Sequence, residues 1–368
     1  MMKILHTESS CGWGGQELRI LTESAALQAR GHQITLVAPL QSQIHERAQA
    51  YGIQSIPLAI EKKRWTGLQD LRRHLTAHHY DVINTHSSTD SWLVSLTQLA
   101  LNKPCPIVRT RHVSAPIKSS WPNRWLYGNS VRKIVTTGEI IREHLIDTLS
   151  LPPEHVVSIP TGIDINLFRP VETDVKAILR SQLALPNEVT LIGIAATLRS
   201  WKGHSYLIEA IAKISDPNLQ LIVIGDGPQM NNLLELTAKL NLNNKVKFVG
   251  HQSNVHEWLQ AIDICCLPSY ANEGVPQALI QAMLSSLPCI TTTAGAIPEL
   301  AKDQETALIV PMKDSDSLAN AIQQLTSNPQ LCEKLGHQAR ALCTTAFSLS
   351  HMADKMEAVF EEAIHSFK

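Results

Sequence analysis

The chain has 368 residues, of which 44% are hydrophobic and 18% charged, and its formal net charge at pH 7 is −1. This length exceeds what one hydrophobic core usually supports, and the composition is far from that of a disordered chain. A near-neutral total charge does not favour nucleic acid as a partner. No apolar stretch long enough to cross a membrane and no signal-peptide core are visible, so we expect a cytoplasmic protein whose membrane contact would be peripheral.

The charge is unevenly distributed along the chain. The first 170 residues hold 18 Lys and Arg against 13 Asp and Glu, whereas the remainder holds 14 against 20. A basic first half would suit an anionic acceptor or membrane surface, although solvated charge on two unrelated halves explains it equally well. The seven cysteines are odd in number and form no CxxC pair, which favours reduced thiols over disulfides or a zinc site.

Short apolar runs alternate with amphipathic helical stretches throughout the chain. We expect strands at 3–7, 33–38, 82–85, 107–110, 133–136, 156–159, 190–196, 219–225, 245–249, 262–267, 289–292 and 307–310. We expect helices at 15–30, 68–79, 88–101, 204–213, 229–240 and 276–286. Several strands are too continuously apolar to face water, so they are expected in parallel sheets covered by helices on both faces.

The predicted fold class is α/β, with two facing Rossmann-like domains. Prolines and a glycine punctuate residues 159–187, where strand character is weak. The predicted domains are 1–168 and 169–348, followed by a C-terminal helix at 349–368 that would pack back on the first domain. Ligands bind beyond the carboxyl ends of parallel strands, so an interdomain cleft is expected.

A glycine-rich loop separates the first expected strand from the first helix. Gly14 and Gly15 would let the backbone approach a ligand, and the helix N-terminus would offer N–H groups to a phosphate. Glu17 stands where a dinucleotide-binding fingerprint starting at Gly12 needs glycine, which makes a nicotinamide oxidoreductase unlikely. A tight turn with no ligand remains the alternative.

Two later motifs follow strands of the second half. Arg199 and Lys202 are two cations at a strand's carboxyl end, where a diphosphate would have its charge neutralised, although surface cations share this spacing. Glu273 lies at a loop-to-helix junction and would accept hydrogen bonds from sugar hydroxyls. Gln281, two turns on, would hydrogen-bond a ribose. Helix capping alone would explain Glu273, but not the whole pattern.

Six motifs occur in order along the chain. They are Gly-Gly-Gln-Glu at 14–17, Ile-Pro-Thr-Gly-Ile-Asp at 159–164, Arg-x-x-Lys-Gly at 199–203, Ile-Gly-Asp-Gly-Pro at 224–228, Glu-Gly-Val-Pro at 273–276 and Gly-Ala-Ile-Pro-Glu at 295–299. Together they resemble family-4 retaining glycosyltransferases, whose two-domain architecture is called GT-B. The similarity covers nearly the whole chain and is most specific in the second domain.

The resemblance implies a hexosyltransferase that uses a nucleotide-diphosphate sugar as substrate, with no cofactor and no metal. It makes 1–168 the acceptor-side domain and 169–348 the nucleotide-sugar-binding domain. The catalytic residues that it implies are His112, Arg199, Lys202 and Glu273. The donor-binding residues that it implies are Gly14, Gly15, Arg199, Lys202, Gly225, Glu273, Gly274, Val275 and Gln281. Glu273 matches the first acid of the family's E-x7-E signature, whereas Gln281 replaces the second acid and would lose charge-assisted strength.

The acceptor is expected to be a saccharide or a lipid-linked glycan in cell-envelope polysaccharide or lipopolysaccharide biosynthesis. Its candidate contacts are Glu17, His86, Arg109 and Arg111. Trp121 and Trp125, with basic residues nearby, would suit a membrane interface, although a core-packed helix with basic flanks also fits. Two other functions stay open, a nucleotide-sugar epimerase of the same architecture and a non-catalytic sugar-nucleotide-binding protein, for which Gln281 is the hint.

Overall fold

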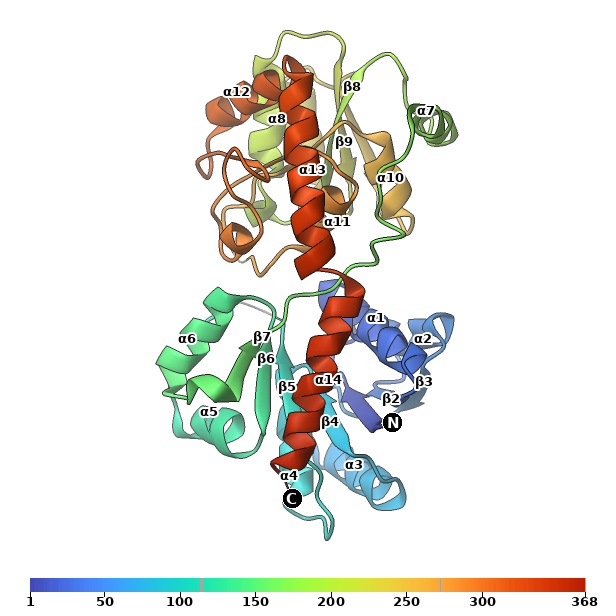
Figure 1. Ribbon diagram of the computed structural model, residues 1–368, viewed down its shortest axis with the longest axis vertical. Coiled ribbons are helices and arrows are strands. Elements are labelled where there is room, and N and C mark those ends of the chain that lie inside the picture. The colour runs from blue at the N-terminus through green and yellow to red at the C-terminus, as the bar shows by residue number, and fades with distance from the viewer. Residues whose placement is uncertain (113–114, 272, 368) are drawn as a thin grey trace. The chain divides into compact units, whose positions relative to one another are not determined.

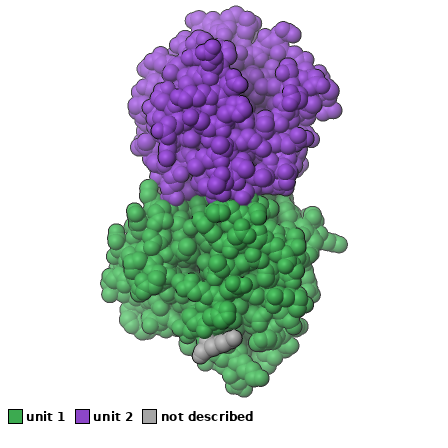
Figure 2. Space-filling view, in the orientation of Figure 1, with its two compact units in different colours: residues 1–162, 349–368 green, residues 163–348 purple. Residues whose placement is uncertain are grey.

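The computed structural model describes residues 1–112, 115–271 and 273–367 and divides the chain into two compact units (Figures 1 and 2). Unit 1 comprises Met1–Gly162 and Leu349–Lys368, and unit 2 comprises Ile163–Ser348. The sequence analysis placed the first boundary after residue 168. The earlier boundary has a local cause, because the Ile163 N–H donates to the Phe347 carbonyl (2.9 Å) and a parallel bridge joins Ile163 to Ser348.

Unit 1 is built on a seven-stranded sheet in the order β3-β2-β1-β4-β5-β6-β7. Its strands are β1 (Lys3–Thr7), β2 (Gln33–Ala38), β3 (Gln54–Pro57), β4 (Val82–Thr85), β5 (Ile107–Arg111), β6 (Lys133–Thr136) and β7 (Val156–Ser158). All pairings are parallel, and in the centre His6 of β1 lies opposite Asn84 of β4. The carboxyl ends of β1, β4 and β5 therefore meet at one edge.

Helices cover both faces of this sheet. They are α1 (Gly15–Ala29), α2 (Gln43–Ala48), α3 (Trp65–Ala77), α4 (Ser88–Gln98), α5 (Trp121–Arg124), α6 (Glu139–Leu149) and α14 (Leu349–His365), with short turns η1 (Gln49–Tyr51), η2 (Trp125–Asn129) and η3 (Pro153–His155). One core lies under α1 and α14, and the other lies under α3, α4, α6 and η2. The α14 helix thus closes one face of unit 1 with buried side chains such as Met356 and Phe360.

Unit 2 repeats the plan with a six-stranded parallel sheet in the order β10-β9-β8-β11-β12-β13. Its strands are β8 (Thr190–Ala195), β9 (Leu219–Ile224), β10 (Val246–Gly250), β11 (Ile264–Leu267), β12 (Cys289–Thr291) and β13 (Leu308–Ile309). Its helices are α7 (Thr173–Gln182), α8 (His204–Lys213), α9 (Met230–Lys239), α10 (Val255–Ala261), α11 (Gln277–Leu284), α12 (Ser315–Thr326) and α13 (Pro329–Ala346), with turns η4 (Ser200–Lys202) and η5 (Ile297–Glu299). The α8, α9 and α12 helices pack on one face, and α10, α11 and α13 pack on the other.

The predicted α/β fold class is confirmed, since every expected strand overlaps an observed one. Strand β3 was not expected from the sequence, because this edge strand is short, has no buried residue and ends in proline. Nor were the helices α2, α5, α6, α7, α10 and α12. Among the described residues, no helix is both long and apolar enough to cross a membrane. The seven cysteines form no disulfide.

Candidate active site

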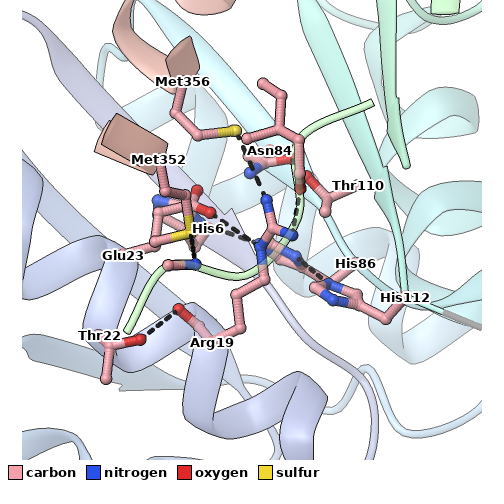
Figure 3. A network of polar contacts seen from close by, with 12 residues as sticks. His6, Arg19, Thr22, Glu23, Asn84, His86, Thr110, His112, Met352 and Met356 are labelled. Carbon is pink, nitrogen blue, oxygen red and sulfur yellow. Dashed lines mark hydrogen bonds and ion pairs between the residues drawn. The ribbon is translucent and has the colours of Figure 1, made fainter. Parts of the chain in front are cut away.

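Three histidines form a hydrogen-bonded chain at the carboxyl edge of unit 1 (Figure 3). His6 Nδ1 lies 2.9 Å from His86 Nε2, and His86 Nδ1 lies 2.9 Å from His112 Nε2. Neighbouring rings stack with centroids 5.2 Å apart. His6 is in β1, whereas the other two directly follow β4 and β5, so the parallel order of these strands creates the chain. We name this set the histidine chain.

The histidine chain is neutral at physiological pH. Burial lowers the pKa of His6 to about 3, and burial, followed by the neighbouring positive charges and imidazoles, holds the pKa values of His86 and His112 well below 6.5. Each neutral ring donates one proton. Nε2 of His6 is buried without a partner in the described chain. Because an unpaired N–H is rarer than an unpaired acceptor, we assign the proton of His6 to Nδ1, which places that of His112 on Nδ1 as well.

An arginine lies beside the histidine chain, wholly inside unit 1. Arg19 of α1 is fully buried, and its Nη1 donates to the Ile159 carbonyl (2.6 Å) while its Nε lies 3.3 Å from Glu23 Oε2. Figure 3 shows its guanidinium next to Met356 of α14, whose sulfur is 3.9 Å from Nη2. Burial lowers the pKa of Arg19 and raises that of Glu23. Neither residue of this pair was expected from the sequence.

A buried carboxyl group directly follows β1. Glu8 Oε1 accepts from the Ser10 N–H (2.6 Å), and the Glu8 carboxyl also contacts the side chains of Gln16 and Ser87. Burial raises the pKa of Glu8 to about 8, and the charge of Asp90 adds to this increase. Burial therefore favours the neutral form of the Glu8 carboxyl, and in that form it can donate a hydrogen bond. Like His86 and His112, it stands at the first position after a strand, which is the sequence signal that could have found it.

Asp90 fixes the start of α4 beneath this carboxyl group. Its Oδ1 accepts from the Ser87 N–H (2.8 Å), and its Oδ2 accepts from the His86 N–H (2.9 Å) and the Thr7 hydroxyl (2.8 Å). Together with Ser87 it forms a capping box. Burial raises its pKa to about 6. Asp90 thereby holds the backbone of His86, and with it the middle of the histidine chain.

The other residues expected in the first domain lie at or near the same edge. Glu17 is buried in the first turn of α1, and Gly14 caps this helix just before Gly15. Arg109 is buried with its guanidinium 4.4 Å from the ring centroid of Tyr127, whereas Arg111 is half-buried. The expected set therefore gathers at one edge of unit 1, and the roles of its members stay predictions.

In unit 2, the expected cation and carboxylate form an ion pair. Lys202 Nζ lies 2.6 Å from Glu273 Oε1, although 70 residues of chain separate them. Glu273 is 4% exposed. Because an ammonium group has three donors, Lys202 keeps hydrogen-bonding capacity for a second anion while it is paired with Glu273. Arg199, just before it, is exposed, and its guanidinium lies over the Trp201 ring at 5.6 Å.

Two glycines allow loops of unit 2 to approach each other closely around the Lys202–Glu273 ion pair. Gly203 has a φ of +78°, and a Cβ there would lie 2.1 Å from the Pro268 carbonyl oxygen. Gly295 has a φ of +55°, and its Cβ would lie 2.1 Å from the Glu273 carbonyl oxygen, which also accepts from the Ala296 N–H. Only glycine permits both this conformation and this approach. The motifs at 199–203 and 295–299 therefore fix the backbone at Pro268 and at Glu273.

The remaining donor-side candidates differ in placement. Gly225 follows β9 in a left-handed conformation against the Ala196 carbonyl, and Gly274 is half-buried beside Glu273. The side chain of Val275 packs in the core of unit 2, so only its backbone is left to meet a donor. Gln281 lies half-buried in α11. Among the described residues, no group of three or more His, Cys, Asp or Glu side chains could hold a metal ion.

Comparison with known proteins agrees with this geometry. Residues 13–167 match the family described as Glycosyltransferase Family 4, and residues 175–342 match the family described as Glycosyl transferases group 1. Two parallel Rossmann-like units that carry these matches define a glycosyltransferase of the GT-B fold. The chain belongs to glycosyltransferase family 4, of the group 1 type, as its motifs predicted.

Relatives of known structure or activity extend the comparison. The chain is 24% identical to the Escherichia coli UDP-Gal:alpha-D-GlcNAc-diphosphoundecaprenol alpha-1,3-galactosyltransferase, over 99% of this chain and 97% of that protein. The structure of a glycosyltransferase from Rickettsia africae superposes with a TM-score of 0.89 at 20% identity, covering 99% and 98% of the two chains. HepE of Anabaena, solved with UDP-glucose, gives 0.84 at 21% identity, covering 98% and 100%.

Proposed function

We propose that this glycosyltransferase moves a hexose from a nucleotide-diphosphate sugar to a saccharide or lipid-linked acceptor of the cell envelope, with retention at the anomeric carbon. The observation that carries the proposal is the Lys202–Glu273 ion pair, set between glycine-fixed loops at the carboxyl edge of unit 2. Two related proteins support the substrate classes. HepE was solved with UDP-glucose, and the E. coli relative is named for a UDP-galactose donor and a diphosphoundecaprenol-linked acceptor.

In the proposed reaction, unit 2 stabilises the leaving diphosphate. Lys202 and the exposed Arg199 neutralise the negative charge that grows on the departing phosphate oxygen. Glu273 holds Lys202 in position and accepts hydrogen bonds from donor-sugar hydroxyls. We propose that these groups act without a metal ion, since fixed cations placed in advance supply the same charge stabilisation.

Retention follows if the acceptor hydroxyl attacks on the face from which the diphosphate departs. The leaving phosphate oxygen then takes the hydroxyl proton as the new glycosidic bond forms. No protein base is required, so the role of the protein is to align the reactants. We propose that His112, held by the histidine chain with its Nδ1 proton outermost, donates to a hydroxyl of the donor sugar. Glu17 and His86 belong to the acceptor side in this scheme.

The test is thermal melting with UDP-, GDP-, ADP- and dTDP-sugars, with and without EDTA. A specific donor stabilises the native protein by mass action and raises its melting midpoint. We expect one donor to raise the midpoint in the presence of EDTA, and the Arg199→Ala/Lys202→Ala double variant to lose this response. No response to any donor, or a response that requires a metal ion, would reject the proposed donor site. The responding donor is then paired with acceptors to measure transfer and anomeric configuration.

We further propose peripheral contact with a membrane through Trp121 of α5. This side chain is 77% exposed, whereas Trp125 stacks on Trp92 with centroids 5.6 Å apart. Only the first of the two expected tryptophans is therefore free to enter a membrane interface. Cosedimentation with anionic liposomes should decrease in the Trp121→Ala variant, and unchanged cosedimentation would remove the proposal.

A further inference from the structure

Basic and aromatic side chains gather on the face of the unit 1 sheet that lies opposite the histidine chain. Along β5, Thr110 donates to Asn84 Oδ1 (3.0 Å) on the histidine side. Since side chains alternate along a strand, Arg109 and Arg111 point to the other face. There they bracket Tyr127, with the Arg109 guanidinium 4.4 Å from the ring centroid and Arg111 Nη1 3.1 Å from the hydroxyl.

Arg109 has unused hydrogen-bonding capacity in a buried position. It is 3% exposed, and its Nε and Nη1 have no hydrogen-bond acceptor among the described residues. Buried donors without partners cost free energy, and the face of Tyr127 offers a cation–π contact but no lone pair for these N–H groups. The guanidinium fork matches two oxygens of a phosphate group.

A third cation approaches the same place. Lys63, in the loop before α3, has its Nζ 5.4 Å from the ring centroid of Trp92, and Trp92 stacks on Trp125. Partial desolvation lowers the pKa of Lys63, and the positive charge of Arg109 lowers it further. The positive charges of Lys63 and Arg109 repel each other, and an anion that binds both would remove this repulsion.

The positive charge of Arg109 acts to lower the pKa of the Asp90 carboxyl, but no ion pair within 4.0 Å joins the two side chains in the described chain. Asp90 accepts hydrogen bonds from Thr7, His86 and Ser87. These three donors occupy both of its oxygens. Asp90 therefore serves the start of α4 and leaves the guanidinium donors unmet.

We propose that Lys63, Arg109 and Arg111 bind a phosphate or diphosphate group of the acceptor. This inference rests on the proposed function, and it narrows the acceptor to a phosphorylated saccharide, either lipid-linked or soluble. Arg109 supplies the buried fork, Arg111 is oriented by the Tyr127 hydroxyl, and Lys63 reaches the anion from the exposed side.

The test uses inorganic pyrophosphate and isothermal titration calorimetry. The Arg199→Ala/Lys202→Ala chain serves as background, because the donor-side cations would also bind this anion. We expect Arg109→Gln to weaken pyrophosphate binding about 10–100-fold and the exposed Lys63→Ala to weaken it about fivefold. Arg73→Gln, a change of an exposed arginine in α3, should have no effect. Affinities within twofold of the background in both site variants, or an equal loss in Arg73→Gln, would overturn the proposal.

A donor measurement separates this site from the proposed donor site. With native Arg199 and Lys202, the Arg109→Gln and Lys63→Ala variants should keep the full rise in melting midpoint that a sugar nucleotide causes, which also shows that they fold. A native chain that binds pyrophosphate through Lys63 and Arg109 but responds to no sugar nucleotide would defeat the proposed function and leave the anion site standing.

Two further probes distinguish the sources of the phosphate. One is a phosphatidylcholine vesicle that carries a polyprenyl diphosphate, and the other is soluble N-acetylglucosamine 1-phosphate. Vesicle binding that is lost in Lys63→Ala assigns the site to a lipid carrier. Binding of only the soluble compound, lost in the same variant, assigns it to a free phosphosugar. Binding of either probe that persists in both Lys63→Ala and Arg109→Gln would reject the site.

Discussion

The carboxyl edges of the two sheets differ in what forms them, so we call that of unit 1 the side-chain edge and that of unit 2 the backbone-built edge. In unit 1 the edge consists of side chains, with the histidine chain, Arg19 and Arg109 buried among the strand ends. In unit 2 it consists mainly of backbone, with loops pressed together at Gly203 and Gly295 around one ion pair. A backbone-built edge fixes the shape of a ligand site in advance. An edge built from polar side chains fixes hydrogen-bond directions and charge, and it depends on burial.

The side-chain edge should be most sensitive to the loss of a buried charge. Changing Arg19 to Met leaves Glu23 buried without its cation, and we expect a loss of about 3–5 kcal/mol in the free energy of unfolding. The matched change is Arg73→Met, since the Arg73–Asp70 pair is exposed and should contribute at most about 0.5 kcal/mol. Urea unfolding measures both.

The Arg19→Met/Glu23→Leu double variant sharpens this test. Removing both charges should restore most of the stability, because no unpaired buried charge is left. Equal destabilisation by Arg19→Met and Arg73→Met would show that the buried pair has no special weight in unit 1.

The single ion pair at the backbone-built edge should matter for turnover. Lys202→Ala should lower turnover about 10²–10³-fold, as expected for the loss of one electrostatic donor to the leaving group. Lys213 also pairs with a carboxylate, Asp316, at 2.6 Å, but on the surface of α8, so Lys213→Ala is the control and should stay near the native rate. Steady-state kinetics with the donor that raises the melting midpoint measures the turnover of both variants. Near-native turnover of Lys202→Ala would contradict the assigned role.

A comparison of two glycines in unit 2 separates the energetic cost of a left-handed backbone conformation from the cost of a close backbone contact. Gly203 and Gly250 have similar φ values of +78° and +71°, but a Cβ at Gly250 would meet nothing within 4 Å. Gly250→Ala should cost about 1 kcal/mol for the left-handed conformation alone, and Gly203→Ala about 3 kcal/mol, because the loop must also move away from Pro268. Chemical denaturation compares them. Equal costs would mean that the close approach at Gly203 adds nothing.

The pH dependence of the free energy of unfolding tests the protonation state of one buried histidine in unit 2. His204 of unit 2 is buried with neither ring nitrogen partnered in the described chain, and burial lowers its pKa to about 3. Below pH 6.5 the His204 imidazole binds a proton in the unfolded chain but stays neutral in the folded chain. The free energy of unfolding therefore falls as the pH decreases. The contribution is about 1.4 kcal/mol per pH unit for this histidine.

The His204→Leu variant should lack that contribution. Its stability at pH 7.5 should be no lower than native, since two unpaired polar atoms are removed. Between pH 6.5 and 5 its stability should fall less steeply than native, by the slope of one proton. Urea unfolding across this range provides both values, and parallel curves would contradict the inferred state of His204.

Much of the fold could be predicted from local sequence. Buried parallel strands are apolar on both faces, so strands such as β8 and β9 are visible as continuous runs. The edge strand β3 has no such run, and it was missed. The first boundary between the two units was not visible either, because the Ile163–Phe347 backbone contact beside it joins residues far apart in the chain.

The sequence by itself determined the elements of the backbone-built edge. Gly203, Gly295 and the residues around Glu273 lie in short motifs, because a turn or a close approach needs particular residues at fixed local spacing. These motifs also revealed the family. What they could not show is that Lys202 and Glu273 pair, since this contact depends on β8 and β11 being neighbours in the sheet.

Only the tertiary structure decided the side-chain edge. His6 lies in an expected strand and His86 and His112 each follow one, and they form a chain because β1, β4 and β5 are adjacent and in register. Burial then shifts their pKa values, as it does that of Glu8. Strand order and desolvation depend on how the whole chain packs, so they cannot be predicted from a local pattern of residues.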